Sequence, residues 1–141
     1  MLVLTKNTAL DALSCYNNRI QHLDLSVNDA LSYLDCHDNN LVSLDVRSSV
    51  LNQLLFYNNP RLRRVTCINT PLKSIDLTQN SALDLLTCNG NQFASLDLTK
   101  NTALTYLSCY GNILKSLDLT QNTALTGLNC DDNQLTNLDL S

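Results

Sequence analysis

Residues 103–118 read ALTYLSCYGNILKSLD and residues 82–97 read ALDLLTCNGNQFASLD, so the motif that starts at Ala82 returns at Ala103. The cysteines keep the same spacing, except for one longer gap between the second and the third. They are Cys15, Cys36, Cys67, Cys88, Cys109 and Cys130. A repeat of this length indicates a solenoid, in which each repeat contacts only its neighbours and the stack buries a shared core.

Each of these periods contains two shorter units. The A unit is L-x-x-L-x-C-x-x-N, as in residues 104–112, and the B unit is L-x-x-L-D-L-x-x-N, as in residues 114–122. Units start at residues 10, 20, 31, 41, 51, 62, 72, 83, 93, 104, 114, 125 and 135. Alternating apolar residues point to one face of a short strand, and Asn suits the corner that follows. We therefore expect one β-rich solenoid over residues 1–141, with short parallel strands and little or no helix.

These repeats resemble the leucine-rich-repeat family, and the nested units of ten and eleven residues resemble its bacterial IRREKO subtype. The resemblance covers essentially the whole chain. It implies a right-handed coil of about 21 residues per turn with an asparagine ladder, and a bacterial protein, on the cell surface or secreted, that acts in recognition or adhesion. We see no capping segment at either end, although solenoids normally need polar caps, so a fragment of a longer protein is expected.

The region from residue 51 to residue 61 is an extra half-unit. Either it bulges out as a loop, or it occupies a normal half-turn and the A and B units exchange faces from there onward. Its apolar positions, Leu51, Leu54 and Phe56, are intact. Exposing them would forfeit about 1.5–3 kcal/mol each, which favours the exchange. The exchange predicts that Cys36 and Cys67 lie in different columns.

The cysteine positions are interpreted as structural. The equivalent slot of the B units holds Leu or Val, and in the unit at residue 51 it holds Phe56. Free Cys is often buried as a small apolar residue, and the short spacing of a zinc site is absent. We predict no cofactor, no metal and a core that includes Cys15, Cys36, Phe56, Cys67, Cys88, Cys109 and Cys130.

Outward positions of the A units carry all the tyrosines and one of the two histidines. We predict a binding surface from Tyr16, Tyr33, His37, Tyr57, Tyr106 and Tyr110. With the exchange of faces, the first four share one face and the last two lie on the other. Exposed Tyr offers a large contact area at low entropic cost. The alternative is ordinary packing between neighbouring exposed strands.

The B units carry an outward aspartate between their two inward residues. We predict an acidic ladder of Asp24, Asp45, Asp76, Asp97, Asp118 and Asp139. Repulsion between like charges should raise the pKa of these carboxyls, unless hydroxyl groups, cations or a basic partner compensate. Calcium needs six to eight oxygens, which one carboxylate per turn does not supply. The basic cluster Arg61, Arg63 and Arg64 is interpreted as a solvated rim that offsets this charge.

Composition excludes several functions. The net charge of −4 argues against nucleic-acid binding. No apolar run is long enough to span a membrane, and no signal peptide is visible in this stretch. His22, Asp24 and Ser26 would form a flat row without an oxyanion hole, so we predict no enzyme. We expect a scaffold that binds a protein or, second, a glycan. The alternatives are a spacer or rod that associates end to end through uncapped ends and, less favoured, a cation-binding or water-ordering face.

Overall fold

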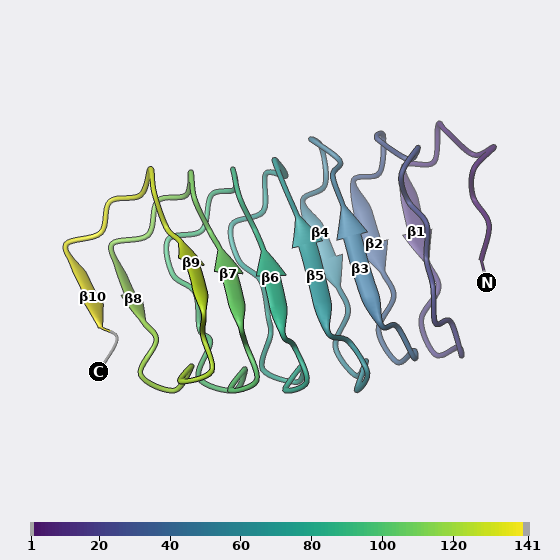
Figure 1. Cartoon of the computed structure of the whole chain (residues 1–141). Coiled ribbons are helices and arrows are strands. Elements are labelled where there is room, and N and C mark those ends of the chain that lie inside the picture. The colour runs from purple at the N-terminus through teal and green to yellow at the C-terminus, as the bar shows by residue number, and fades with distance from the viewer. Residues whose placement is uncertain (1, 140–141) are drawn as a thin grey trace.

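A computed structural model describes residues 2–139, and they form a solenoid of short parallel strands without a helix (Figure 1). The strands are β1 (Ala12–Ser14), β2 (Tyr33–Asp35), β3 (Ser43–Val46), β4 (Gln53–Leu55), β5 (Arg64–Cys67), β6 (Leu85–Thr87), β7 (Tyr106–Ser108), β8 (Ser116–Asp118), β9 (Gly127–Asn129) and β10 (Asn137–Asp139). They pair in parallel at the spacing of the sequence repeat, which confirms the predicted fold class. The described residues contain no helix of the length and hydrophobicity that crossing a membrane requires.

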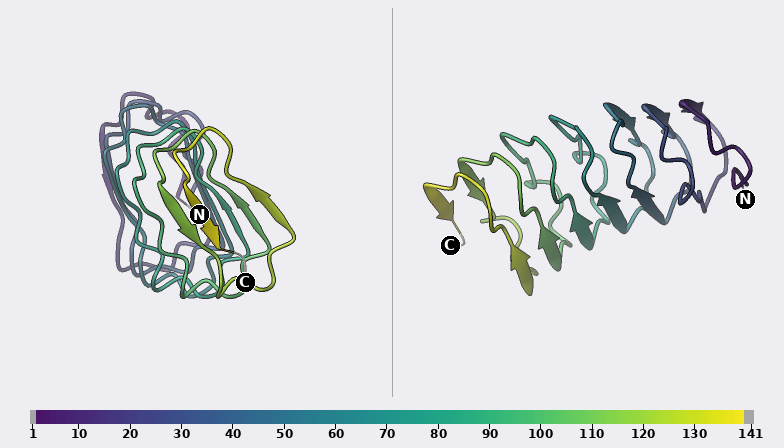
Figure 2. Two further views of the ribbon diagram at one scale, coloured as in Figure 1. Left: turned by 90° about the vertical axis from the view of Figure 1, so that its left-hand side faces the viewer. Right: turned by 90° about the horizontal axis from the view of Figure 1, so that it is seen from above.

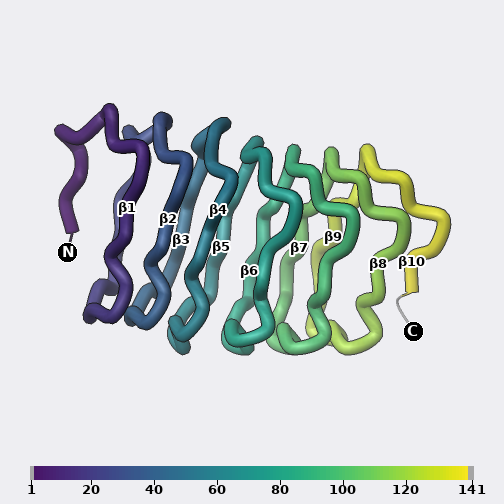
Figure 3. The backbone as a smooth tube through the Cα atoms, turned by 180° about the vertical axis from the view of Figure 1, so that it is seen from behind, coloured from purple at the N-terminus to yellow at the C-terminus, as the bar shows by residue number. Residues whose placement is uncertain are grey.

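The strands line two sides of a flattened coil (Figures 2 and 3). The first side carries the sheet β1-β2-β4 and, farther along, the pair β8-β10. The second side carries the five-stranded sheet β3-β5-β6-β7-β9. Between β4 and β8 the first side is formed by the units that begin at residues 72 and 93, whose turns are joined by a hydrogen bond from Gln92 N to Leu72 O at 2.9 Å.

The alternating motif produces the core. In β3 the inward residues Leu44 and Val46 are buried while Ser43 and Asp45 are exposed. Leu residues of successive turns lie in register, as Leu86 does with Leu107, and both are fully buried. Each burial of this kind stabilises the fold by about 1.5–3 kcal/mol relative to exposure. A single half-turn could not achieve it, because its apolar face is covered only by the turns above and below.

The extra half-unit occupies a normal half-turn. Its strand β4 pairs with β2, and Leu34 lies opposite Leu54. On the second side, β3 of a B unit pairs with β5 of an A unit, which places Val46 opposite Cys67. Cys36 and Cys67 therefore lie in different columns, and the predicted exchange of faces is confirmed. We call the junction between residues 41–61 and residues 62–82 the seam.

Asparagines tie successive A units together. The Asn112 amide donates to the carbonyls of Cys88 and Cys109, both at 2.9 Å, and its oxygen accepts the Phe93 N–H at 3.1 Å. One side chain thus satisfies three backbone groups of two turns, which would be costly to bury unpaired. Asn39, Asn59, Asn91 and Asn133 also donate to two carbonyls of successive turns.

The B units use asparagine differently, and the seam interrupts their ladder. The Asn101 amide donates to the carbonyls of Leu77 and Asn80, at 3.1 and 3.0 Å. Asn80 itself is 1% exposed, and neither its amide nitrogen nor its oxygen has a partner among the described residues. The turn that precedes Asn80 on the first side is an A unit, so the register of the B-unit ladder has no continuation there.

The corners of the A units are left-handed. Gly90 and Gly111 have φ of 64° and 66°. The same corner in the other A units and in the unit at residue 51 holds Asn17, Asp38, Asn58, Asn69 and Asp132, all with φ between 50° and 55°. Gly, Asn and Asp are the residues that tolerate this conformation. The corner is therefore selected by backbone geometry, and its side chains are carried outward beside the strands.

Candidate functional site

Three rings of successive turns on the first side stack on one another. The centroids of Tyr16 and His37 lie 4.6 Å apart with an interplanar angle of 6°, and those of His37 and Tyr57 lie 4.3 Å apart at 18°. We call these three residues the aromatic stack. It follows from the register, because each ring directly follows the inward residue that comes after its strand: Cys15, Cys36 and Phe56. Neighbouring parallel strands then bring the rings face to face.

Two carboxylates hold the central ring. Nδ1 of His37 donates to Asp35, and Nε2 lies 3.4 Å from Asp38 Oδ2. Asp35 is 5% exposed and also accepts a hydrogen bond from the Tyr33 hydroxyl at 3.2 Å. The pKa of the Tyr33 phenol is raised by its desolvation and by the negative charge of Asp35. The network restrains His37 and covers a buried carboxylate that would otherwise be unpaired.

The corners beside the stack enclose a shallow hollow of about 440 Å³. We call it the corner hollow, and it is lined by Asn18, Asp38, Asn39, Asn40, Asn58, Pro60 and Gln79. Asp38 lies in its wall and accepts a hydrogen bond from the Asn58 amide at 2.8 Å. Because Asp38 directly follows His37 and Asn58 directly follows Tyr57, the hollow and the aromatic stack form one continuous surface.

Tyr106 and Tyr110 lie on the second side, away from the stack. They are 41% and 40% exposed. Tyr106 lies opposite Gly127 in the sheet, and a Cβ at Gly127 would come within 2.7 Å of the Tyr106 ring. The glycine therefore leaves room for this ring to lie over β9. The predicted binding residues thus fall into two groups, of which only the first is organised by ring stacking among the described residues.

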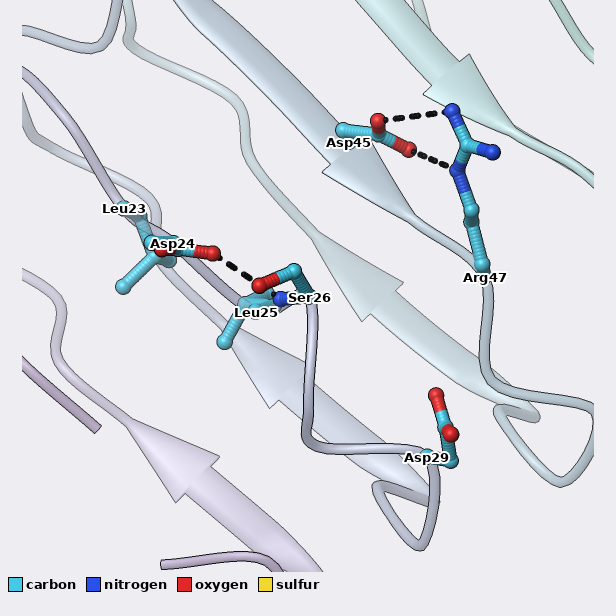
Figure 4. A pocket seen from close by; sticks show the side chains of 7 residues that line it. All are labelled: Leu23, Asp24, Leu25, Ser26, Asp29, Asp45 and Arg47. Carbon is cyan, nitrogen blue, oxygen red and sulfur yellow. Dashed lines mark hydrogen bonds and ion pairs between the residues drawn. The ribbon is translucent and has the colours of Figure 1, made fainter. Parts of the chain in front are cut away.

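The six B-unit aspartates do not form a single ladder. Asp45 of β3 lies opposite Thr66 of β5, so its column ends at the seam. Asp24 and Asp45 line one hollow of about 370 Å³ on the second side (Figure 4), where Arg47 binds Asp45 at 2.9 and 3.0 Å. The remaining aspartates lie on the first side, where Asp118 pairs with Asp139. The exchange of faces therefore divides the predicted acidic ladder between the two sides, because it applies to the aspartates as well as to the tyrosines.

We predicted that repulsion would raise the pKa of the B-unit aspartates. That prediction was wrong for the three aspartates whose pKa shift is resolved. The pKa of Asp76 is lowered, mainly by hydrogen bonds from the Thr78 hydroxyl and backbone N–H at 2.7 and 3.0 Å. The pKa of Asp97 is lowered in the same way by Thr99, and that of Asp24 by Ser26. Hydrogen bonds to an ionised carboxylate favour its charged form, and here they outweigh repulsion across the turns, which solvent screens.

The cysteine slots are core positions. Cys36, Cys67, Cys88 and Cys109 are buried thiols, and Cys15 and Cys130, toward the two ends, are half-buried. Phe56 is buried in the same column as Cys36. Burial raises the pKa of the Cys67 and Cys109 thiols to about 12, which disfavours the reactive thiolate. Within residues 2–139, no group of three or more His, Cys, Asp or Glu residues is arranged to hold a metal ion.

Sequence reasoning missed Asp35, Asp38 and the amides of the corner hollow. The signal for Asp35 was present, because alternation along a strand places Tyr33, Asp35 and His37 on the same outward face. Asp35 is also the single acidic residue at the central outward position of an A-unit strand. Asp38 carried a weaker signal, since its corner role depends on a left-handed backbone that Asn and Gly fill equally well.

No sequence model of a known family matches the chain, and no curated protein matches it. Among solved structures, it is similar to the functional domain of InlJ from Listeria monocytogenes, which includes a cysteine ladder. The two are 34% identical with a TM-score of 0.58, over 99% of this chain and 34% of that one.

Two further solved structures share the fold at lower identity. The internalin InlF from Listeria monocytogenes is 20% identical with a TM-score of 0.53, over 98% of this chain and 56% of that one. The leucine-rich-repeat protein LIC12759 from Leptospira interrogans is 18% identical with a TM-score of 0.55, over 94% of this chain and 40% of that one. The chain thus spans between about a third and a little over half of these proteins. Its fold is the leucine-rich-repeat solenoid.

Proposed function

We propose that the protein is a non-catalytic scaffold of bacterial origin that recognises another protein through the first-side surface made of the aromatic stack and Tyr33. The observation that carries this proposal is the stack itself. Its rings are held in place before any partner arrives, by each other and by the Asp35 network. A surface that is already ordered loses little side-chain entropy on binding.

The composition of the surface supports the same function. Tyrosine combines a large apolar area with a polar group at its end and is enriched where proteins bind one another. The rings lie on short strands of a rigid stack rather than on a long loop, which keeps their spacing constant. Of the binding residues predicted from the sequence, the proposal therefore uses the aromatic stack and Tyr33. Tyr106 and Tyr110 form a separate surface on the second side.

Similarity to known proteins supports the wider setting. The solved relatives include internalins of Listeria monocytogenes, and the repeats resemble a family whose members act in recognition and adhesion. We propose, on the support of this similarity, that the protein is secreted or lies on the bacterial surface. The nested units of ten and eleven residues favour the IRREKO subtype within the leucine-rich-repeat proteins.

The proposal is tested by capture with matched variants. The chain is immobilised on beads and exposed to membrane-protein extracts of candidate host cells, and captured proteins are identified by mass spectrometry. We expect one or more proteins to be retained by the wild type and by the double variant Tyr106→Ser with Tyr110→Ser. They should be lost from the double variant Tyr16→Ser with Tyr57→Ser. Identical capture by both double variants would show that the stack is not the recognition surface.

A self-associating rod is the second candidate. Leu13 of β1 and Leu128 of β9 are half-exposed, whereas their counterparts Leu34 and Leu107 are fully buried. Strands at such ends also leave backbone groups unpaired. Size-exclusion chromatography over a hundredfold range of concentration separates the two functions, since end-to-end association predicts growth with concentration and recognition by a monomer does not.

A further inference from the structure

The corner hollow is lined by hydrogen-bond acceptors and by no basic side chain. Asp38 contributes a carboxylate that is 41% exposed, and Asn18 and Asn58 each have a side-chain oxygen for which no donor among the described residues is recorded. Nor does a Lys or Arg pair with Asp35 or Asp38 within the described part of the chain. The hollow therefore suits a ligand group that donates several hydrogen bonds and carries positive charge.

The aromatic stack adds apolar surface beside the hollow. Tyr16 is the first ring of the stack and is 51% exposed. One of its faces contacts His37, and its ring edge contributes to the exposed surface. A long side chain with a charged end can lay its methylene groups along such rings while its charged group reaches a carboxylate.

The electrostatic potential at this surface is negative. The pKa of the Tyr57 phenol is raised by desolvation and by the charges of Asp35 and Asp38. The field that disfavours a phenolate also favours an added cation, because both effects reflect the same carboxylates. An aromatic surface, a carboxylate and amide oxygens thus lie next to one another.

We propose that the corner hollow and the aromatic stack together receive an arginine side chain of the partner protein. The guanidinium donates to Asp38 and to the amide oxygens of the hollow, and the methylene chain of the arginine lies along the exposed edges of the stacked rings. Arginine fits better than lysine, because its five N–H donors lie in one plane and can bind a carboxylate and amide oxygens at the same time. This inference rests on the proposed recognition function and names the chemistry that the partner presents.

The probe is the peptide acetyl-Gly-Arg-Gly-amide, titrated into chain labelled with ¹³C in the rings of Tyr and His. We expect saturable chemical-shift changes at Tyr16 and His37 and none at Tyr106. The peptide with citrulline in place of arginine, which is neutral but has nearly the same shape, should bind at least tenfold more weakly. The lysine peptide should bind several-fold more weakly. Maltotriose is titrated in parallel, because a neutral glycan could also use amide oxygens and ring faces.

Two single substitutions make the test specific. Asp38→Asn removes the charge and keeps a residue that the same left-handed corner accepts at Asn17 and Asn58, so folding should be preserved. It should weaken arginine binding at least tenfold. Asp118→Asn removes one charge from the same side, several turns away, where the carboxylate is bonded to Thr120. It should change the affinity less than twofold.

Several outcomes would overturn the inference. Equal weakening by both substitutions would reduce it to nonspecific attraction by an acidic protein. Equal binding of the arginine and citrulline peptides, an absence of saturable shifts, or saturable binding of maltotriose alone would exclude the arginine site. If the Tyr16 and Tyr57 variants still lose a captured protein while Asp38→Asn retains it, the recognition function stands and only the arginine assignment fails.

Discussion

The first side of the solenoid has two regions that share a core and differ on the surface. Before the seam, the strands β1, β2 and β4 end in left-handed corners and carry the aromatic stack. After it, the units at residues 72, 93 and 114 carry Asp and Thr in place of the rings, and each Thr closes a local bond to its Asp. Inward residues are apolar in both regions. The fold is thus set by one half of the motif, which leaves the outward half free to vary.

The second side shows that the type of unit is not sufficient for a stack. At the position of Tyr16, His37 and Tyr57, the A units of β5, β6, β7 and β9 have Ile68, Asn89, Tyr110 and Asp131. A single ring there has no aromatic neighbour in the next turn. The stack requires rings in consecutive turns, because the parallel register places one residue of each turn opposite the same residue of the next.

The largest expected effect distinguishes the asparagines of the first two B units after the seam. Asn101→Ala should destabilise the protein by about 2–4 kcal/mol, because two buried carbonyls lose the donors that Asn101 provides. Asn80→Ala, one turn earlier at the same position, should cost under about 1 kcal/mol, because its amide bonds nothing among the described residues. Urea unfolding followed by circular dichroism measures both. Equal losses would mean that the seam does not interrupt the ladder.

The corners provide a smaller effect. Gly111→Ala places a Cβ on a residue with φ of 66° and should cost about 1–2 kcal/mol. Gly111→Asn should cost less, since Asn occupies this corner at Asn17, Asn58 and Asn69. The matched change in a B-unit corner is Lys100→Ala, where the backbone is not left-handed, and it should lie within about 0.5 kcal/mol of the wild type. A similar loss at Lys100 would remove the difference between the corners.

Gly90→Ala tests how tightly the same corner is packed. A Cβ there would lie 2.1 Å from the Asn69 side-chain oxygen, whereas at Gly111 the nearest atom is 3.6 Å away. Gly90→Ala should therefore cost more than Gly111→Ala, by an amount on the order of 1 kcal/mol that reflects the displacement of Asn69. The additional substitution Asn69→Gly should remove this excess while leaving the common backbone cost. Thermal unfolding of Gly90→Ala, Gly111→Ala, the double variant and Asn69→Gly alone measures both terms.

The smallest expected effect on stability comes from Asp76 and Asp97. It is measured through the pH dependence of stability. The pKa values of Asp76 and Asp97 are lowered in the folded chain, so their contribution to stability is present above the unfolded pKa. It is lost as the pH falls through the lowered value. Thr99→Val should shift the pKa of Asp97 upward, as measured by carboxyl ¹³C resonances, while Asp76 is unchanged. A melting temperature that rises steadily from pH 5 to pH 2.5 would contradict this sign.

The sequence was sufficient to predict what repeats in the structure. Alternation and spacing identify the inward residues of every strand, and the intact apolar positions of residues 51–61 predict the exchange of faces through the cost of exposing them. The same reasoning placed Tyr16, Tyr33, His37 and Tyr57 on one side. Features that arise between turns were harder to foresee. The signs of the Asp76 and Asp97 shifts depend on local bonds from Thr78 and Thr99, and a like-charge argument ignores those bonds.

The role of Asp38 could not be predicted because it depends on three turns at once. Its carboxylate faces His37 of its own turn and Asn58 of the next. The hollow that it lines also includes Gln79, which lies beyond the seam. A one-dimensional motif records the distance along the chain between such residues, and only the coil shows that they share a corner.

The seam also determines how a protein of this kind can change by insertion. Adding a complete turn lengthens the coil and leaves every later side chain on its original side. Adding one half-unit transfers all later side chains to the opposite side in a single event, while Leu51 and Phe56 stay buried. Tyr106 faces away from Tyr16 because its unit is the ninth after that of Tyr16, so an odd number of half-turns separates them. Interchangeable half-turns thus let evolution rearrange the outward surface without altering a residue of the core.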